Sequence, residues 1–152
     1  MNVILKMLSS FFFIGYLPLM PGTFGSLAGL LLFYYVKDSW RLSLLLALSV
    51  TALGFLISGR AEKLFGRKDP SRIVIDEVSG MLLCLLFIPH DLKYVIAAFF
   101  LFRIFDTLKP FPAARLQGLK GSLGIMIDDI IAAIYAGVLL QLVLRLAAFK
   151  AS

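Results

Sequence analysis

The stretch Leu42–Ser58 reads LSLLLALSVTALGFLIS and contains no charged residue. Four more apolar stretches accompany it: Phe24–Val36, Val78–Pro89, Tyr94–Phe105 and Ile125–Phe149. Leucine, alanine and phenylalanine dominate all of them, and most glycines and prolines lie between them, so helices are expected. Helices also satisfy their own backbone hydrogen bonds in lipid. The sequence therefore predicts one all-α domain over residues 1–152, a polytopic membrane bundle of about four to five short apolar helices.

The composition supports burial in a bilayer rather than in a soluble core. Hydrophobic residues make up 61% of the chain and charged residues 16%, against roughly 45–50% and about 25% in soluble domains. A soluble protein of this size leaves much of its surface exposed to water and could not hide so much apolar area. Several stretches are shorter than the roughly 20 residues of a typical span. Their helices are expected to extend into flanking polar residues, to tilt little or to thin the bilayer.

The net charge of +6 does not indicate a nucleic-acid partner, because the bases lie between apolar runs and form no single solvated face. Positive charge in such places marks the cytoplasmic ends of membrane spans and favours anionic lipid. The two long basic loops, residues 59–75 and 107–124, are therefore expected in the cytoplasm with the N-terminus. The side on which the C-terminus lies stays open. Val3–Tyr16 lacks a small-residue cleavage site, so we expect it to stay attached.

This topology gathers distant polar residues at one membrane end. Nine acids occur in the chain, and five of them adjoin apolar stretches: Asp76, Glu77, Asp106, Asp128 and Asp129. An acid next to hydrocarbon is costly, which makes it a candidate for function. Each could instead be a simple helix-end residue, but all five are expected at one end. Clustered carboxylates need a cation, and oxygen ligands beside a phosphate suit Mg²⁺. Glu77 is the preferred ligand or general base.

Basic and hydroxyl residues accompany the acids. Arg103, Asp106 and Lys109 are spaced three apart, so they lie near one helix face. They form either a local ion-pair ladder or a site in which Arg103 and Lys109 bind phosphate. Pro21–Ser26 opens the first long span, where Thr23 or Ser26 caps the helix or faces an anion. Gly25 with Gly29, and Ala133 with Gly137, are small-residue pairs typical of helix packing.

Other residues narrow the chemistry. His90 is the only histidine and is expected in a turn at the opposite end, while Cys84 lies inside an apolar stretch. Neither is placed for a nucleophilic role, so phosphoryl chemistry would depend on carboxylates and a metal. A cation transporter using the same acids as an ion site is the alternative. A structural membrane protein would give no reason to concentrate acids at one end.

Four stretches, taken in order, resemble the phosphatidylglycerophosphatase A family: GYLPLMPGTFGS at Gly15–Ser26, IVIDEVSG at Ile73–Gly80, FRIFDTLKPFP at Phe102–Pro112 and GSLGIMIDDIIA at Gly121–Ala132. They span most of the chain and keep the family's order and approximate spacing. The sequence departs from the family at Ala113–Lys120, where relatives often carry an acid near Gln117 and a slightly longer loop.

The resemblance implies a Mg²⁺-dependent lipid phosphatase of the bacterial inner membrane. Such an enzyme would remove the terminal phosphate of phosphatidylglycerophosphate on the cytoplasmic side, giving phosphatidylglycerol and inorganic phosphate. The implied partners are this substrate and membrane lipids, and the oligomeric state stays open. Glu77, Asp106, Asp128 and Asp129 are the expected metal ligands, Asp76 joins them as a catalytic carboxylate, Arg103 and Lys109 orient the phosphate, and Thr23 and Ser26 contact the headgroup.

Overall fold

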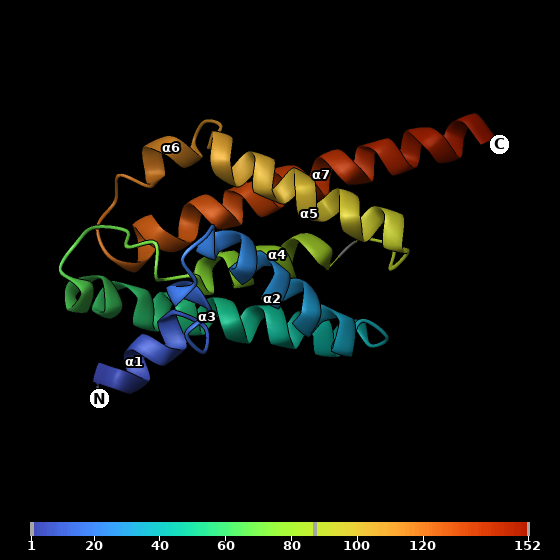
Figure 1. The fold of residues 1–152 in the computed structure, drawn as a ribbon. Coiled ribbons are helices and arrows are strands. Elements are labelled where there is room, and N and C mark those ends of the chain that lie inside the picture. The colour runs from blue at the N-terminus through green and yellow to red at the C-terminus, as the bar shows by residue number, and fades with distance from the viewer. Residues whose placement is uncertain (1, 87, 152) are drawn as a thin grey trace.

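A computed structural model describes residues 2–86 and 88–151, and every regular element in them is helical (Figure 1). The elements are α1 (Asn2–Ser9), the 3₁₀ helix η1 (Ile14–Tyr16), α2 (Pro21–Val36), α3 (Trp40–Phe65), α4 (Ile75–Leu85), α5 (Leu92–Leu108), α6 (Ala113–Leu116) and α7 (Ser122–Ala151). The all-α prediction is confirmed. Each of the five predicted apolar stretches falls mainly on one helix, and α1 and α6 are additional.

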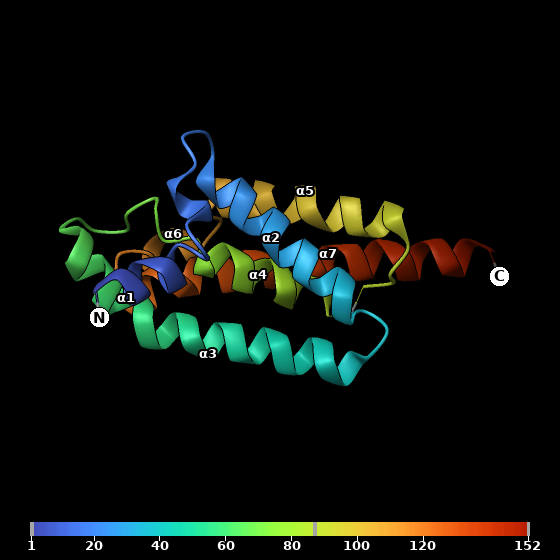
Figure 2. The same cartoon turned by 60° about the horizontal axis from the view of Figure 1, so that its bottom comes forward.

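Helix α4 forms the centre of the bundle and contacts α2, α3, α5 and α7. It lies between these longer helices in both ribbon views (Figures 1 and 2). Almost every residue of α4 is buried, from Ile75 to Leu85. The helix begins three residues before the predicted stretch, so that Asp76 and Glu77 fall in its first turn, where the helix dipole favours a negative charge.

Small residues let α2 approach α4 closely. A β-carbon at Gly29 would lie 2.7 Å from the carbonyl oxygen of Val78, and one at Gly25 would lie 3.0 Å from the β-carbon of Val74. Real β-carbons essentially never approach as closely as the first distance. The prediction that Gly25 and Gly29 are helix-packing residues is therefore confirmed, and this contact fixes the beginning of α2 against the first turn of α4.

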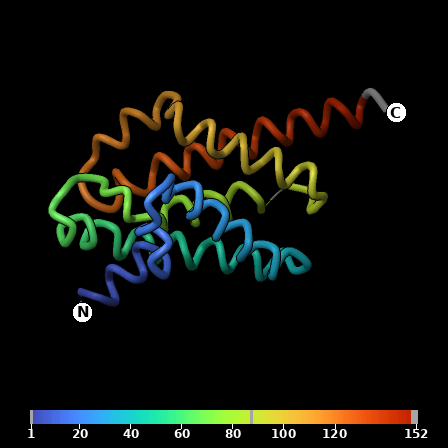
Figure 3. Tube along the Cα trace, in the orientation of Figure 1, coloured from blue at the N-terminus to red at the C-terminus, as the bar shows by residue number. Residues whose placement is uncertain are grey.

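Helix α7 is anchored on α3 near its own beginning. The backbone N–H of Gly59 donates to Ser122 Oγ at 2.7 Å, and Ser58 Oγ lies 3.8 Å from Met126 Sδ. Gly54 faces the end of the Met126 side chain. Beyond these contacts α7 extends away from the bundle, and the two chain termini lie at opposite ends of the molecule (Figure 3).

Two helices among the described residues are long and apolar enough to cross a membrane. They are Trp40–Phe65 and Ser122–Phe149, each with a mean hydropathy of 2.1. Helix α2 is apolar but shorter, and α4 with 11 residues measures about 16 Å at 1.5 Å per residue, half the thickness of a bilayer's hydrocarbon core. The predicted count of four to five apolar helices is thus not confirmed, while a membrane location is consistent with α3 and α7.

Candidate active site

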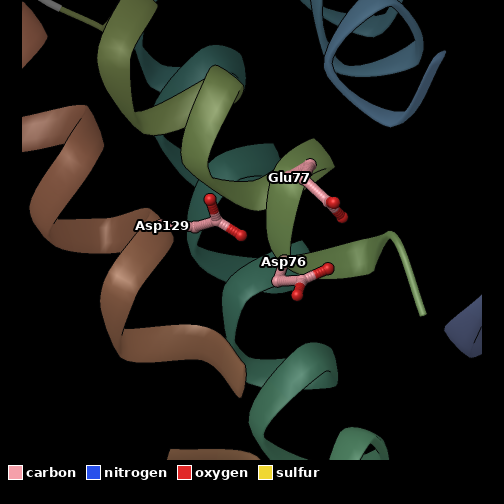
Figure 4. Close-up of side chains that lie close together, drawn as sticks. All are labelled: Asp76, Glu77 and Asp129. Atoms are coloured by element: carbon pink, nitrogen blue, oxygen red, sulfur yellow. The ribbon is translucent and has the colours of Figure 1, made fainter. Parts of the chain in front are cut away.

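Three carboxylates from two helices meet beside the first turn of α4. Asp76 and Glu77 come from α4 and Asp129 from α7, and one oxygen of each lies within 4.8 Å of the others. Figure 4 shows Asp129 reaching from α7 toward the first turn of α4, which carries Asp76 and Glu77. The sequence prediction placed these acids at one end of the bundle, and the structure brings these three into one group.

The local packing explains how α7 comes so close to α4. A β-carbon at Gly80, one turn after Asp76, would lie 2.7 Å from the Phe102 ring and 3.1 Å from the carbonyl oxygen of Asp129. Because Gly80 has no side chain, both α5 and α7 can pack closely against α4 at this position. The approach that Gly80 permits is that of Asp129 and Phe102.

The carboxylates are buried and incompletely satisfied. Asp76, Asp128 and Asp129 are exposed by 6%, 4% and 3%. One buried oxygen of each, and one of Glu77, has no hydrogen-bond partner in the described structure. A buried ionised oxygen without a partner is costly, and several together also repel. Oxygen-only donors grouped in this way fit a hard divalent cation such as Mg²⁺. The residues present therefore fit the metal that the sequence predicted.

Two basic residues of α5 border the carboxylate group. Arg103 pairs with Asp106 at 2.7 Å, and Lys109 lies 3.9 Å from Asp106 and pairs more closely with Asp128. The ion-pair ladder, one of the two alternatives for Arg103, Asp106 and Lys109, is present in the structure. Asp106 and Asp128 are thus engaged by bases, outside the group that Asp76, Glu77 and Asp129 form. A direct role for either in holding a metal stays a prediction.

The charge of Lys109 is maintained by its neighbours. Burial acts to lower the pKa of the Lys109 ammonium, but the hydrogen bond and charge of Asp128, with the charges of Asp106 and Asp129, raise it above its ordinary value. Lys109 is the left-handed residue that ends α5, with φ 46°. It therefore presents a positive charge where the helix stops.

The beginning of α2 lies against both the acids and Arg103. A β-carbon at Gly22 would collide with Glu77 Oε1 and lie 3.2 Å from Arg103 Nη2. Ser26 Oγ donates to the carbonyl of Gly22 at 3.0 Å and accepts from Arg103 Nη1 at 3.4 Å. Thr23 Oγ1 is buried without a partner. Both hydroxyl residues predicted for the headgroup therefore lie at this end of the bundle.

Gly22 is the site residue that the sequence left unassigned. Its role in the structure is to leave room for Glu77 and Arg103. The only feature of the sequence that could have pointed to Gly22 is its position between Pro21 and Thr23, at the beginning of a predicted helix. The two excluded residues lie elsewhere: the His90 ring packs 5.2 Å from Phe33, near the opposite end of α2, and Cys84 is buried late in α4.

Comparisons with known proteins identify the family of the chain. The family model described as phosphatidylglycerophosphatase A matches residues 7–144. Proteins named phosphatidylglycerophosphatase A are 37% identical in Escherichia coli strain K12, covering 82% of this chain and 75% of that protein, and 42% identical in Haemophilus influenzae, covering 76% and 74%.

A third relative carries a different substrate in its name. This Bacteroides thetaiotaomicron protein, provisionally named a phosphatidylinositol-3-phosphatase, is 36% identical over 83% of this chain and 84% of its own. No solved structure matches the chain. The match over residues 7–144 includes every acid and base of the candidate site, and the chain belongs to the phosphatidylglycerophosphatase A family, whose members are phosphatases that hydrolyse a phosphate monoester.

Proposed function

We propose that the chain is a Mg²⁺-dependent phosphatidylglycerophosphatase. It would hydrolyse the terminal phosphate of phosphatidylglycerophosphate and leave phosphatidylglycerol and inorganic phosphate. The observation that carries the proposal is the group of three carboxylates, Asp76 and Asp129 buried and Glu77 half-buried, with unpartnered oxygens next to Arg103. The family and two relatives named for this activity support the substrate.

In this proposal Asp76, Glu77 and Asp129 hold the cation, and Asp106 and Asp128 are further ligands if their basic partners turn to the substrate. When bound, Mg²⁺ would polarise the phosphoryl group and make an attacking water more acidic. A hard cation in contact with three carboxylates would also relieve the repulsion between them. The chain supplies oxygen ligands in a buried place, as such a cation requires.

The bases orient the phosphate. The Arg103 guanidinium presents several N–H groups in a fixed fork that suits two phosphate oxygens, and Lys109 adds a compact charge. In the present arrangement Arg103 is held by Asp106 and Lys109 mainly by Asp128, so the substrate phosphate would replace carboxylate oxygens as their partner. Thr23 Oγ1, which is buried without a partner, is an additional donor on the same side.

The acids of the site also supply a proton acceptor. A water attacks phosphorus, the bond from phosphorus to the glycerol oxygen breaks, and the water's proton passes to a carboxylate, for which Glu77 is the preferred candidate. The same carboxylate then gives that proton to the departing glycerol oxygen, so that one water is consumed and the carboxylate is restored. Neither Cys84 nor His90 is needed, and both lie away from the carboxylates.

The proposed location is the bacterial inner membrane, with several crossings and the site on the cytoplasmic side. The basic segments 59–75 and 107–124 flank the site end of the bundle, and positive loops are retained in the cytoplasm. Two apolar helices support membrane insertion. A lipid in the inner leaflet would then present its phosphate at the depth of Arg103 and Lys109.

The test is phosphate release by the purified protein in detergent micelles. Phosphatidylglycerophosphate is compared with phosphatidylinositol 3-phosphate, each with Mg²⁺ and then with excess EDTA. We expect release from the first lipid, dependence on Mg²⁺ and little release from the second. Phosphate release that persists in EDTA would contradict the proposed dependence on Mg²⁺. A preference for the inositol lipid would contradict phosphatidylglycerophosphate as the substrate. No release from folded protein would favour the cation transporter, to be examined by ion flux in liposomes.

A further inference from the structure

Two loops beside the site expose large apolar side chains. Leu19 and Met20, just before α2, are exposed by 74% and 69%, and Leu108 and Phe111, where α5 ends, by 71% and 73%. The apolar residues exposed along α3 and α7 belong to candidate membrane spans. These four instead lie at helix ends and in loops, where water-facing segments would carry polar side chains. An exposed apolar group of this kind marks a contact with a membrane or another protein.

The two loops flank the basic side of the site. Met20 precedes Pro21 and Gly22, and Gly22 adjoins Glu77 and Arg103. Leu108 lies between Asp106 and Lys109 in the chain. Arg103 bridges the two sides through its bond to Ser26 of α2. Figure 2 shows the loop that leads into α2 projecting from the bundle.

The backbone conformation directs both loops, the one before α2 and the one after α5, away from the bundle. Met20 and Lys109 each adopt the left-handed conformation, with φ 49° and 46°, so the chain turns sharply where α2 begins and where α5 ends. The hydroxyl of Tyr135 on α7 donates to the carbonyl of Phe111 at 2.8 Å. The backbone of Phe111 is therefore tied to the bundle while its ring stays exposed.

We propose that Leu19, Met20, Leu108 and Phe111 form an apolar lip that inserts into the leaflet holding the substrate, and that the lipid headgroup enters between α2 and α5. This inference rests on the proposed lipid substrate. The acyl chains would lie against the lip, and the phosphate would reach Arg103 and Lys109 directly behind it. Apolar side chains above basic ones match an anionic phospholipid, whose phosphate lies just outside its hydrocarbon.

The first experiment compares two forms of the same substrate. Phosphate release is measured from long-chain phosphatidylglycerophosphate in vesicles and from a short-chain, water-soluble form. Leu108→Ser and Leu19→Ser should each lower the ratio of vesicle to soluble activity by about ten-fold, because a polar side chain removes one inserted anchor. The matched control is Leu92→Ser: Leu92 opens the same helix at its other end and is exposed by 70%. An unchanged ratio in both lip variants, or an equal fall in Leu92→Ser, would overturn the lip.

A second experiment does not depend on catalysis. Tryptophan is placed at Leu19 (Leu19→Trp) in a protein whose only tryptophan, Trp40, is changed by Trp40→Phe, and the protein is reconstituted in phosphatidylglycerol vesicles. Fluorescence should be quenched by lipids spin-labelled close to the headgroup and protected from aqueous iodide. Quenching by iodide alone would overturn the insertion, even in a fully active enzyme. Lipid quenching in a protein that releases no phosphate would keep the lip and refute only the proposed function.

Discussion

The two ends of helix α4 have opposite characters although they contact the same helix, α7. At the first turn, Asp76 and Glu77 meet Asp129 in a tightly packed, charged site. At the last turn, a groove between α4 and α7 has a volume of about 770 Å³. Most of its lining residues are apolar. It is lined by Leu83, Cys84, Leu86, Ile130, Ala133, Ile134, Gly137, Val138, Gln141, Leu142 and Arg145.

The difference follows from helix length and from small residues. Gly22, Gly25 and Gly80 bring α2, α5 and α7 against the first half of α4, whereas α4 ends at Leu85 while α7 continues to Ala151. At Gly137 a β-carbon would make only an ordinary contact, 3.8 Å from the carbonyl of Cys84. The same pair of helices thus offers a closely packed charged site at one end and open apolar space at the other.

The largest effect is expected at the charged end. Asp129→Asn keeps the size of the side chain but removes the charge of one of the three grouped carboxylates. Phosphate release should fall by about 100-fold or more, the typical loss when a transition-state electrostatic contact is removed. The assay is release from phosphatidylglycerophosphate with Mg²⁺ by protein recovered from the membrane fraction. A variant that inserts normally and keeps most of its activity would remove Asp129 from the site.

Arg103→Lys keeps the charge but removes the planar fork that reaches both Ser26 and Asp106. We expect kcat/KM for the lipid to fall by about ten-fold, because lysine cannot bind two phosphate oxygens in a fixed plane. The matched control is Arg145→Lys in the groove, which should leave kcat/KM unchanged. Equal effects of the two substitutions would show that Arg103 contributes charge alone.

A pair of glycine substitutions separates the two ends directly. Gly22→Ala would push a methyl group into Glu77 Oε1 and against Arg103, so activity should fall several-fold and the melting temperature should drop, with a cost of about 1–3 kcal/mol. Gly137→Ala has room in the groove and should change neither quantity. A destabilised Gly137→Ala protein would show that the groove is closed when the chain is in a membrane.

The smallest effect is expected at His90, which lies between α4 and α5 with its ring against Phe33. His90→Ala should leave phosphate release near that of the unaltered protein, because no carboxylate of the site is near it. A large loss would mean that the far end of α4 takes part in the reaction and would contradict the proposed topology.

Much of this arrangement could be predicted from the sequence, because apolar runs and charge spacing are local signals. Each apolar stretch marks a helix, and the spacing of Arg103, Asp106 and Lys109 predicted their ion pairs. The short helices α1 and α6 were missed because 8 and 4 residues give too little periodicity to recognise.

Which acids pair with a base and which join the carboxylate group depends on tertiary packing, and this could not be predicted from the sequence. Asp128 and Asp129 are adjacent in sequence, yet one pairs with Lys109 while the other joins Asp76 and Glu77. Successive helical residues point about 100° apart, and only the placement of α5 and α4 around α7 decides which neighbour each meets. Asp76 was expected as a catalytic carboxylate rather than a metal ligand, and its position beside Glu77 and Asp129 now supports both roles.

The most direct test of the site is metal binding measured without turnover. Mn²⁺ is titrated into purified protein and followed by electron paramagnetic resonance, with Mg²⁺ as competitor. We expect the unaltered protein and His90→Ala to bind Mn²⁺ and to release it to Mg²⁺, and Asp129→Asn to bind at least about ten-fold more weakly, since one ionised ligand is lost. Absence of binding in the unaltered protein, or equal binding in Asp129→Asn, would contradict a metal held by Asp76, Glu77 and Asp129.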